Sequence, residues 1–481
     1  MIGTLKPQQL WQYFEELCRI PRISKHEQRV RGYVEEFCRS HHLDYRIDQT
    51  GNIIIRKPAS PGYESGSGVI LQAHLDMVPQ KDSHVQHDFL HDPIQPYIDG
   101  EWVKARSTTL GADNGIGVAA ILAVMADKTI AHGPLEALLT IDEETGMTGV
   151  FGLKSDALNG TVLLNLDTEE EGELCIGCAG GLNATIRGDL KWQKVRSNLK
   201  TFSVKICGLK GGHSGCDIHL GRANAIKIMV RYLSYLWMKL PIRMVSLEGG
   251  TLRNAIPREC TAVFAFSPRM EKKVLKETDI FRDILATEYR DIDTDIILTL
   301  NEISLPEKIL TEFSQHQFIN LLYSLPNGVI RKIPGMPDVV ETSNNLAIAR
   351  IKNKSFEIHN LIRSSSASAK ADLAQQICSV CQLANARMKF HGDYPGWDPR
   401  FDSPLLQSMK TIYHDMFHKD PKVTVVHAGL ECGIIGSIYP HLQMVSFGPT
   451  ILYPHSPGEK VHIPSVERFW NFLLAVLEKI K

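Results

Sequence analysis

The stretch Val69-Ile-Leu-Gln-Ala-His-Leu-Asp76 joins a short apolar run to a histidine and an aspartate. The run carries no charge and has the length of a strand, so it predicts a buried β-strand that ends at about residue 73. His74 and Asp76 follow at the carboxyl end of that strand, where open α/β sheets place their functional side chains. Residues i and i+2 of an extended segment share a face, so we expect the two side chains on one side.

Two further apolar runs end in acidic residues. The run at 136–141 is followed by Glu143 and Glu144, and the run at 162–166 is followed by Asp167. Strands and helices alternate up to about residue 187, which predicts an α/β fold with a mostly parallel sheet and helices on both faces. The carboxyl ends of parallel strands meet at one edge of a sheet, so we expect these acidic side chains to converge with His74.

Two more segments contribute residues of the same chemical kind. Asp113 stands directly before a predicted helix that starts near Gly115, and His455 follows a late strand. A helix amino terminus stabilises a carboxylate, and two neighbouring ions need a carboxylate that bridges them, so Asp113 is the natural bridge. The sequence predicts one or two zinc-class ions bound by these residues: His74, Asp113, Glu144, Asp167 and His455.

Two residues beside the predicted ligands are expected to have other roles. If Glu144 binds metal, Glu143 is free to take a proton from the attacking water and pass it to a leaving amine. Asp76 could accept the imidazole N–H of His74 and thereby fix its tautomer. A lone acidic residue after a strand is usually a turn former or a helix cap. Three acidic strand ends together with a His-x-Asp pair favour a metal site.

Composition narrows the class of protein. The 481 residues exceed what one hydrophobic core usually supports, so two domains are expected. The formal net charge is −1, from 53 basic and 54 acidic residues, and there is no basic stripe, so neither a nucleic-acid nor a membrane partner is expected. The sequence begins without the apolar segment of a secretory signal. Ten cysteines over this length are no disulfide framework, and a cytoplasmic location is expected.

The position of His455 determines the expected domain organisation. A turn-rich connector, Gly392–Pro399, separates it from the other predicted ligands, which all precede residue 187. The catalytic domain must therefore be discontinuous, with one part at 1–187 and a second at 393–481. Residues 188–392 are expected to form an inserted α+β lid domain, because the acidic strand ends cease there while strands and helices continue.

Two local sequence patterns predict a helix start and an internal repeat. Ser24-Lys-His-Glu27 has the serine and glutamate spacing of a capping box, which predicts that a helix opens there. Within the insert, residues 251–263 and 342–351 each place an asparagine before a strand-like run. This similarity is the basis for expecting a tandem repeat of a β-α-β-β-type unit.

Taken together, the motifs resemble the co-catalytic zinc metallopeptidases of family M20. The resemblance rests on His74-x-Asp76, Gly-x-Asp113-Asn-Gly, Asp142-Glu-Glu144, Asn-x-Asp167 and the late His455. Longer strings resemble the bacterial branch of the family that cleaves Xaa-His dipeptides; they lie at 108–117, 176–181, 212–219, 394–397 and 427–433. The resemblance covers nearly the whole chain.

The resemblance implies a zinc-exopeptidase fold with two zinc ions per chain, for which cobalt or manganese could substitute. His74, Asp113 and Asp167 would bind one ion. Asp113, Glu144 and His455 would bind the other. Glu143 would be the general base and Asp76 the carboxylate that orients a ligand.

The resemblance also implies a dipeptide substrate and assigns groups of the lid. His213 would steady the tetrahedral intermediate, Asn254 and Arg363 would hold the substrate, and Gly429 would offer a backbone contact. A guanidinium can grip a carboxylate through two hydrogen bonds, so Arg363 suits the carboxyl terminus of the substrate. A homodimer is expected, in which His213 could act across the interface or within its own chain, and a monomer is the alternative.

Two other functions fit parts of the sequence and are alternatives to a dipeptidase. An N-acyl amino acid deacylase of the same family would share the metal and base motifs, so these motifs cannot separate it from a dipeptidase. Gly115-Ile-Gly-Val-Ala-Ala120 fits a loose dinucleotide-binding fingerprint. It follows a polar loop rather than a strand, and the carboxylate of Asp113 would repel a pyrophosphate.

Overall fold

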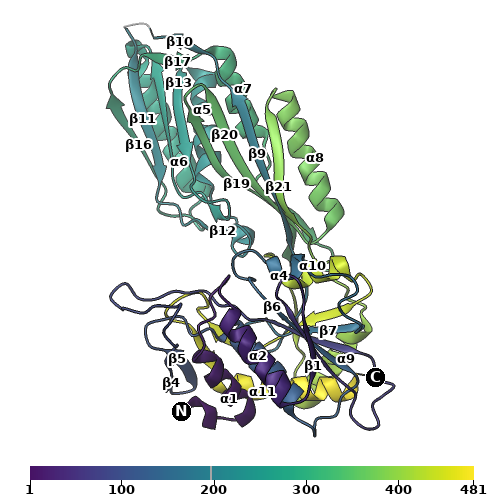
Figure 1. Ribbon diagram of the computed structural model, residues 1–481. Helices are drawn as coiled ribbons and strands as arrows, with labels where there is room; N and C mark the ends of the chain where they lie inside the picture. The colour runs from purple at the N-terminus through teal and green to yellow at the C-terminus, as the bar shows by residue number, and fades with distance from the viewer. Residues whose placement is uncertain (196–197, 481) are drawn as a thin grey trace. The chain divides into compact units, whose positions relative to one another are not determined.

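The computed structural model describes residues 1–195 and 198–480, which form two compact units (Figure 1). Unit 1 comprises Met1–Gly177, Trp397–Val425 and Leu430–Lys481. Unit 2 comprises Cys178–Gly396 and Val426–Gly429. The limits predicted from the sequence, at residues 187 and 392, stay a prediction for where independently folding domains begin and end.

Unit 1 is built on an eight-stranded sheet with the order β1-β2-β6-β3-β7-β23-β8-β22. Its strands are β1 (Asp44–Ile47), β2 (Ile53–Lys57), β3 (Val69–His74), β6 (Leu135–Thr140), β7 (Val162–Asn165), β8 (Glu173–Cys178), β22 (Lys422–Val426) and β23 (Gln443–Ser446). The four central strands β6, β3, β7 and β23 are parallel, whereas β1, β2 and β8 pair antiparallel with their neighbours. The predicted α/β class is confirmed, and the parallel part of the sheet is its centre.

Helices cover this sheet. They are α1 (Gln8–Cys18), α2 (Gln28–Ser40), α3 (Ala112–Ala126), α4 (Thr148–Phe151), α9 (Pro404–Phe417), α10 (Glu431–Ile438) and α11 (Ile463–Lys479), with a 3-10 turn at Ile2–Thr4. Helix α3 packs against β3 and α9 against β23, while α1 packs on α3 and α11 on α9. Strands β3, β6 and β7 are buried along their whole length, as their apolar runs predict.

A small second sheet joins distant parts of unit 1. Its strands are β4 (Pro96–Asp99), β5 (Trp102–Ala105), β24 (Ile451–Leu452) and β25 (Lys460–His462), in the order β24-β25-β5-β4. The loop from β24 to β25 carries His455, and the chain after β5 leads to Asp113. The pairing of β25 with β5 therefore places a late histidine beside an early aspartate.

Unit 2 contains a nine-stranded antiparallel sheet and two short ribbons. Its strands are β9 (Gly180–Asp189), β10 (Trp192–Lys194), β11 (Lys200–Cys207), β12 (Gly212–His213), β13 (Arg243–Gly249), β14 (Ala255–Ile256), β15 (Cys260–Phe266), β16 (Ile297–Ile303), β17 (Lys308–Leu310), β18 (Gly328–Ile333), β19 (Met336–Lys352), β20 (Ser355–Ser364) and β21 (Arg387–Tyr394). The helices are α5 (Ala225–Lys239), α6 (Glu271–Glu288), α7 (Glu312–Ser324) and α8 (Ala367–Leu383), with 3-10 turns at Ile218–Leu220 and Pro268–Met270.

The order of strands in unit 2 reveals an internal repeat. Eight strands of the sheet run in the order β16-β11-β15-β13-β19-β20-β9-β21, and the ninth, β18, also pairs with β19. One half of the sheet belongs to the segment with β11, α5, β13, β15, α6 and β16, and the other to the segments with β9, α7, β19, β20, α8 and β21. If the four strands of each half are numbered 1 to 4 along the chain, their order across the sheet is 2-3-1-4 in both halves, read outward from β13 and from β19. The first half is inserted between β9 and α7 of the second, so the copies are nested rather than consecutive.

Two local expectations need correction. The asparagines that suggested the repeat are not equivalent, because Asn254 lies between β13 and β15 whereas Asn345 lies inside β19. The capping box is wrong as well: α2 begins at Gln28, its cap is Glu27, and no side chain accepts the free amides there. Ser24 donates to a residue outside the motif, and Glu27 accepts from Lys25 and from Asp142, as described below.

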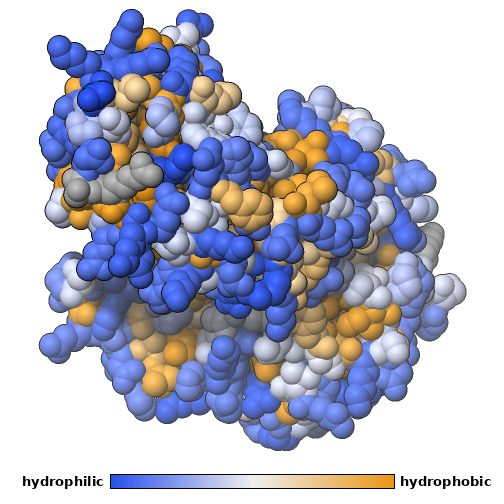
Figure 2. Space-filling view, turned by 90° about the horizontal axis from the view of Figure 1, so that it is seen from above, coloured by the Kyte–Doolittle hydropathy of each residue, from blue (hydrophilic) through white to orange (hydrophobic). Residues whose placement is uncertain are grey.

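One face of the molecule is mostly hydrophilic, with apolar side chains gathered in separate patches (Figure 2). Large apolar side chains exposed on the helices of unit 2 include Met238, Phe313 and Leu383. Within residues 1–195 and 198–480, no helix combines the length and the apolar character that crossing a membrane requires.

Candidate metal centre and substrate-binding groups

The predicted metal ligands converge in unit 1. His74 is the last residue of β3, Glu144 lies in the loop after β6, and Asp167 follows β7 by two residues. Asp113 lies in the first turn of α3, and its backbone is still extended there, at φ −80° and ψ 111°. His455 lies in the loop between β24 and β25. The carboxyl ends of the parallel strands thus meet as predicted.

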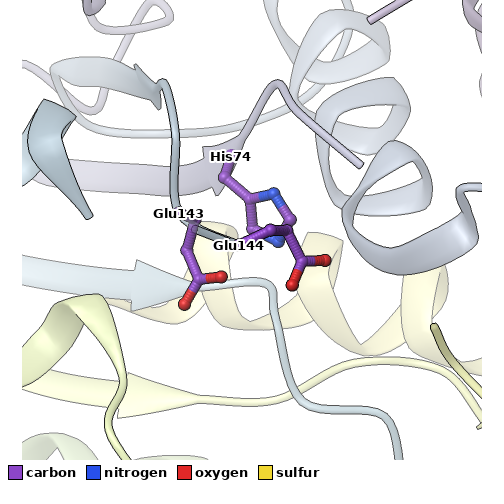
Figure 3. Close-up of side chains that lie close together, drawn as sticks. All are labelled: His74, Glu143 and Glu144. Carbon is purple, nitrogen blue, oxygen red and sulfur yellow. The ribbon is translucent and has the colours of Figure 1, made fainter. Parts of the chain in front are cut away.

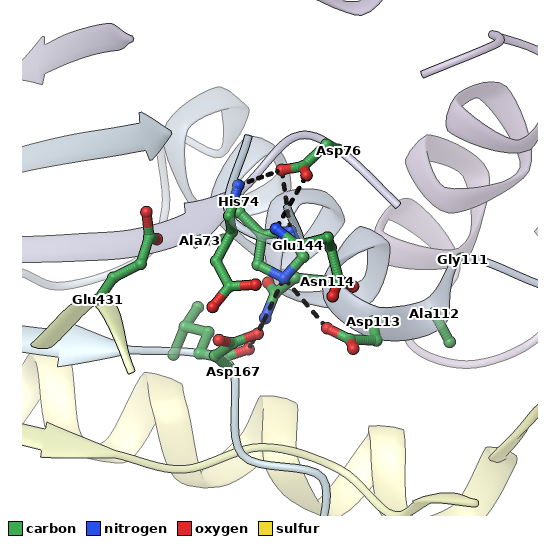
Figure 4. A network of polar contacts seen from close by, with 12 residues as sticks. Ala73, His74, Asp76, Gly111, Ala112, Asp113, Asn114, Glu144, Asp167 and Glu431 are labelled. Carbon is green, nitrogen blue, oxygen red and sulfur yellow. Dashed lines mark hydrogen bonds and ion pairs between the residues drawn. The ribbon is translucent and has the colours of Figure 1, made fainter. Parts of the chain in front are cut away.

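Asp113 stands between the two histidines. One carboxylate oxygen, Oδ1, lies 3.1 Å from Nε2 of His74, and the other, Oδ2, lies 3.1 Å from Nε2 of His455. The His74 Nε2 atom is also 3.3 Å from Oδ1 of Asp167. The His455 Nε2 atom is 3.0 Å from Oε2 of Glu144. Two groups of three possible ligands therefore share the carboxylate of Asp113. Figure 4 shows the first group, His74, Asp113 and Asp167.

The geometry fits cations between these atoms. His74 Nδ1 lies 3.4 Å from Oδ1 of Asp76, so this carboxylate favours the tautomer with the proton on Nδ1. In that tautomer the lone pair of Nε2 points at two carboxylate oxygens, which is repulsive without a positive charge between them. The Oε1 atom of Glu144 is buried without a hydrogen-bond partner among the described residues. Imidazole and carboxylate donors of this kind suit zinc-class ions.

The protonation of the cluster reflects its excess of carboxylates. Burial opposes a charged His74, yet Asp167, Asp113 and Asp76 outweigh it and hold the pKa of His74 well above its usual value. Hydrogen bonds to the carboxylates of Asp113 and Glu144 raise the pKa of His455 to about 11. In each case the neighbouring carboxylates make the ring attract a proton, and a bound cation would compete with that proton.

Glu143 lies next to these ligands. Figure 3 shows the carboxylates of Glu143 and Glu144 on either side of the His74 imidazole, and ligand atoms of all three residues lie within 4.8 Å of one another. Burial raises the pKa of Glu143 well above its usual value, and nearby carboxylates including Asp167 raise it further. Among the possible ligand groups, Glu143 occurs with His74 and Glu144 and not in the two that contain Asp113.

Asp76 ties two of the strand-end loops together. Its Oδ1 accepts a hydrogen bond from the backbone N–H of Glu143 at 3.1 Å, and its Oδ2 accepts one from that of Glu144 at 3.2 Å. Burial would raise the pKa of Asp76, but the bond to His74 outweighs it and lowers this pKa to about 2. Asp76 therefore stays ionised and can orient His74.

Glu459 performs a similar task at the start of α3. Its buried carboxylate accepts hydrogen bonds from four successive backbone N–H groups: Leu110 and Ala112 at 2.7 Å, Gly111 at 3.0 Å and Asp113 at 3.3 Å. These bonds fix the backbone that carries Asp113. Burial raises the pKa of Glu459 to about 7, and the charge of Asp113 adds to this rise.

The predicted substrate-binding groups gather in unit 2. His213 of β12 pairs with Ala255 of β14, next to Asn254, and the N–H of Ser214 donates to the Asn254 carbonyl at 2.8 Å. The His213 Nδ1 atom accepts from the N–H groups of Cys216 at 3.1 Å and Gly215 at 3.3 Å, so the ring proton is on Nε2. The His213 ring can therefore donate one hydrogen bond outward.

Arg363 and Gly429 belong to the same unit. Arg363 lies in β20 and is only 6% exposed; its Nη1 donates to the Tyr394 hydroxyl at 3.1 Å, and its Nε has no partner among the described residues. Burial lowers the pKa of His213, and the charge of Arg363 lowers it further. Gly429 ends the short segment 426–429. The side chain of Asn254 is exposed.

A buried asparagine holds the ribbon that carries Asn254 and His213. Asn345 of β19 donates its amide hydrogens to the carbonyls of Arg253 at 3.0 Å and Ala255 at 2.8 Å. Arg253 itself donates from Nη2 to Nδ1 of His359 at 2.7 Å. The asparagine pattern seen in the sequence therefore reflects a contact between the two copies of the repeat.

A family model decides what class of protein this is. The model of peptidase family M20/M25/M40 matches residues 70–479. The chain belongs to this family. It is a hydrolase that acts on peptide bonds, and the predicted resemblance is confirmed. The dinucleotide alternative is wrong, because Gly115–Ala120 lies inside α3 of a peptidase.

Relatives of this M20 peptidase match it from end to end. The cytosol non-specific dipeptidase of Escherichia coli K12 is 45% identical over 100% of this chain and 99% of its own length. The crystal structure of aminoacylhistidine dipeptidase from Vibrio alginolyticus is 46% identical, with a TM-score of 0.95 over 100% of this chain and 98% of that one. The aminopeptidase PepT of Bacillus cereus, at 14% identity and a TM-score of 0.58, shares the fold.

Two acidic side chains near the proposed ligands were not predicted, the half-buried Glu169 and the buried Glu431. Burial raises the pKa of Glu169 to about 9, with Asp113 and Asp167 contributing, and burial raises that of Glu431 to about 8. Glu169 stands two residues after Asp167, so i, i+2 spacing could have found it. Glu431 accepts from the Gln72 amide at 2.5 Å and the Thr140 hydroxyl at 2.7 Å, contacts that no sequence spacing reveals.

Proposed function

We propose that this M20 peptidase is a dipeptidase that uses two zinc ions and prefers dipeptides with a carboxyl-terminal histidine. The observation that carries the proposal is the position of Asp113, with one oxygen toward His74 and the other toward His455. The dipeptidase activity is supported by two relatives matched from end to end, one described as non-specific and the other as acting on aminoacylhistidine.

His74, Asp113 and Asp167 would hold one zinc ion, and Asp113, Glu144 and His455 the other, with cobalt or manganese as possible substitutes. When bound, the two ions would polarise the scissile carbonyl and make a water molecule more acidic. Asp76 would keep His74 in the tautomer that leaves Nε2 free to bind metal. The distances between these side chains support the assignment.

Glu143 would move the proton. Its backbone is held by Asp76, and its carboxylate lies within 4.8 Å of ligand atoms on His74 and Glu144. In this position it can take the proton of the attacking water and deliver it to the nitrogen of the departing amine. The two transfers leave Glu143 ionised again for the next cycle.

The groups of unit 2 would bind the substrate. His213, with its proton on Nε2, would donate a hydrogen bond to the oxyanion of the tetrahedral intermediate. The guanidinium of Arg363, buried and with a free Nε–H, would bind the carboxyl terminus of the dipeptide. Asn254 and the backbone of Gly429 would hold the rest of the peptide.

An N-acyl amino acid deacylase of the same family is the alternative, because it would use the same metal ligands and base. A substrate panel separates the two. We expect the zinc-loaded enzyme to cleave Xaa-His dipeptides best, to cleave other dipeptides more slowly, and to leave N-acetyl amino acids nearly untouched. Faster hydrolysis of N-acetyl amino acids would replace the proposal by the alternative, and equal rates on all dipeptides would remove the preference for histidine.

A cytoplasmic location and a homodimer remain parts of the proposal. The relative from Escherichia coli is described as a cytosol enzyme. Mixing a Glu143→Ala protein with a His213→Ala protein, under conditions of subunit exchange, tests whether His213 acts across a dimer. Recovered activity would show that each hybrid has one intact site. Inactivity despite proven exchange would show that His213 serves its own chain.

A further inference from the structure

The segment Arg22–Glu27 joins α1 to α2 and lies outside residues 70–479, the part that the family model matches. It runs beside the chain that leaves β3: Ile23 forms a parallel bridge with Met77, and the N–H of Met77 donates to the Arg22 carbonyl at 3.1 Å. Three of its side chains point into the loops that carry the proposed metal ligands. None of them is a ligand itself.

Arg22 connects two of these loops. Its side chain is 2% exposed, and its Nη1 donates to the carbonyls of Leu75 and Asp76, each at 2.9 Å. Its Nη2 donates to the carbonyl of Gly111. The first two carbonyls follow His74, and the third precedes Asp113. One rigid, planar guanidinium therefore sets the separation between the loop of one proposed ligand and the loop of the bridging one.

The glycines of the Asp113 motif make room for this guanidinium. A Cβ atom at Gly111 would lie 2.6 Å from Nη2 of Arg22, and so would a Cβ atom at Gly115. Gly111 also has φ +71°, in the left-handed region that favours glycine. The spacing Gly-x-Asp-x-Gly therefore reflects the position of Arg22 as well as the start of α3.

Glu27 extends the contact to the third loop, and Ser24 adds a bond to the first. The Ser24 hydroxyl donates to Oδ2 of Asp76 at 2.7 Å, on the carboxylate that faces His74. The Glu27 carboxylate accepts from the backbone N–H of Lys25 at 2.8 Å and from that of Asp142 at 3.1 Å. Asp142 immediately precedes Glu143. These are the bonds that replace the predicted capping box.

We infer that the segment Arg22–Glu27 is a positioning element of the metal site, in which Arg22 fixes the distance between the loops of His74 and Asp113 and Ser24 orients Asp76. The inference rests on the proposed metal site. Three hydrogen-bonded side chains within six residues reach the loops of residues 74–76, 111–113 and 142–144. Loss of such supporting bonds usually weakens metal binding about 10–100-fold.

Zinc titration of the metal-free protein tests the inference. We expect Arg22→Met to weaken the binding of both ions about 10–100-fold, because it frees both loops, and Arg22→Lys to restore part of that loss. Ser24→Ala removes a single hydroxyl and should weaken mainly the ion bound by His74. The absorption spectrum of the cobalt-loaded protein should change in the same variants, because it reports the arrangement of the ligands.

Lys57→Met is the matched control. Lys57 is a half-buried cation of unit 1 that donates to the carbonyls of Val124 at 2.8 Å and Asp127 at 2.5 Å, at the opposite end of α3 from Asp113. We expect this variant to lose thermal stability but to bind zinc like the unmodified protein.

The outcomes separate this inference from the proposed function. Unmodified protein that binds no zinc would overturn the metal site itself. Two ions bound with unchanged affinity and spectrum by a folded Arg22→Met protein would overturn only the positioning role. If Arg22→Met does not fold, Ser24→Ala decides, and unchanged zinc affinity there overturns the inference. An equal loss of zinc affinity in Lys57→Met would also overturn the positioning role, because the loss would then follow from lower stability in general.

Discussion

In unit 1 the proposed functional side chains lie at the end of β3, just after β6 and β7, at the start of α3 and between β24 and β25, whereas in unit 2 they lie within β12 and β20 or in loops. Unit 1 gathers carboxylates around two histidines, and unit 2 gathers histidines around a buried arginine. The chemistry differs accordingly. The first arrangement attracts cations, and the second suits the carboxylate and the oxyanion of a peptide substrate.

The largest effect is expected from a change at Glu143, which lies among the carboxylates of unit 1 but is not one of the proposed metal ligands. Glu143→Ala should lower the turnover number on a dipeptide about 10²–10⁴-fold, because it removes the proton carrier. Its zinc content, measured by atomic emission on the same sample, should stay at two ions per chain. Loss of a full equivalent of zinc would place Glu143 among the ligands and refute the role as base.

The difference between the units also predicts how a substitution in unit 2 affects activity and zinc binding. His213→Ala should lower the turnover number about 10²–10³-fold, the usual cost of an oxyanion donor. The affinity for zinc should not change, because no proposed ligand lies in unit 2. His219→Ala is a suitable control: His219 is exposed and lies six residues further along the same segment. A His213→Ala protein that turns over normally would remove His213 from the site.

The two units also differ in how many of their functional residues could be predicted from the sequence. His74 and Asp167 were found because a strand leaves a clear apolar run, and the residue after the run must lie at the sheet edge. His213, Asn254 and Arg363 have no such local pattern, so only the resemblance to the family assigned them. Arg22 and Glu431 could not be found, because their partners are backbone carbonyls and side chains far along the chain.

The nested repeat shows a second limit of sequence patterns. Two asparagine motifs suggested a repeat, yet the equivalence lies in strand order and not in those residues. Asn345 instead binds the backbone on either side of Asn254. A pattern that recurs in a sequence can therefore mark a contact between two copies rather than the same position in each.

The smallest expected effect concerns the electrostatics of unit 2. Burial and the charge of Arg363 both lower the pKa of His213, because each disfavours the imidazolium. Arg363→Met removes the positive charge, so the pKa of His213 should rise toward its ordinary value. NMR titration of the histidine Cε1–H resonances measures this shift, with His213→Ala used to assign the peak. An unchanged pKa would mean that Arg363 does not act on His213.

The central claim is that Asp113 serves two metal ions at once, and the zinc content of three single variants tests it most directly. We expect two zinc ions per chain in the unmodified protein and one in His455→Ala, because Asp113, His74 and Asp167 still hold the other ion. Asp113→Ala should lose both ions, while Asp167→Ala loses only one. An Asp113→Ala protein that retains one tightly bound zinc ion would contradict the shared carboxylate and with it the account of this site.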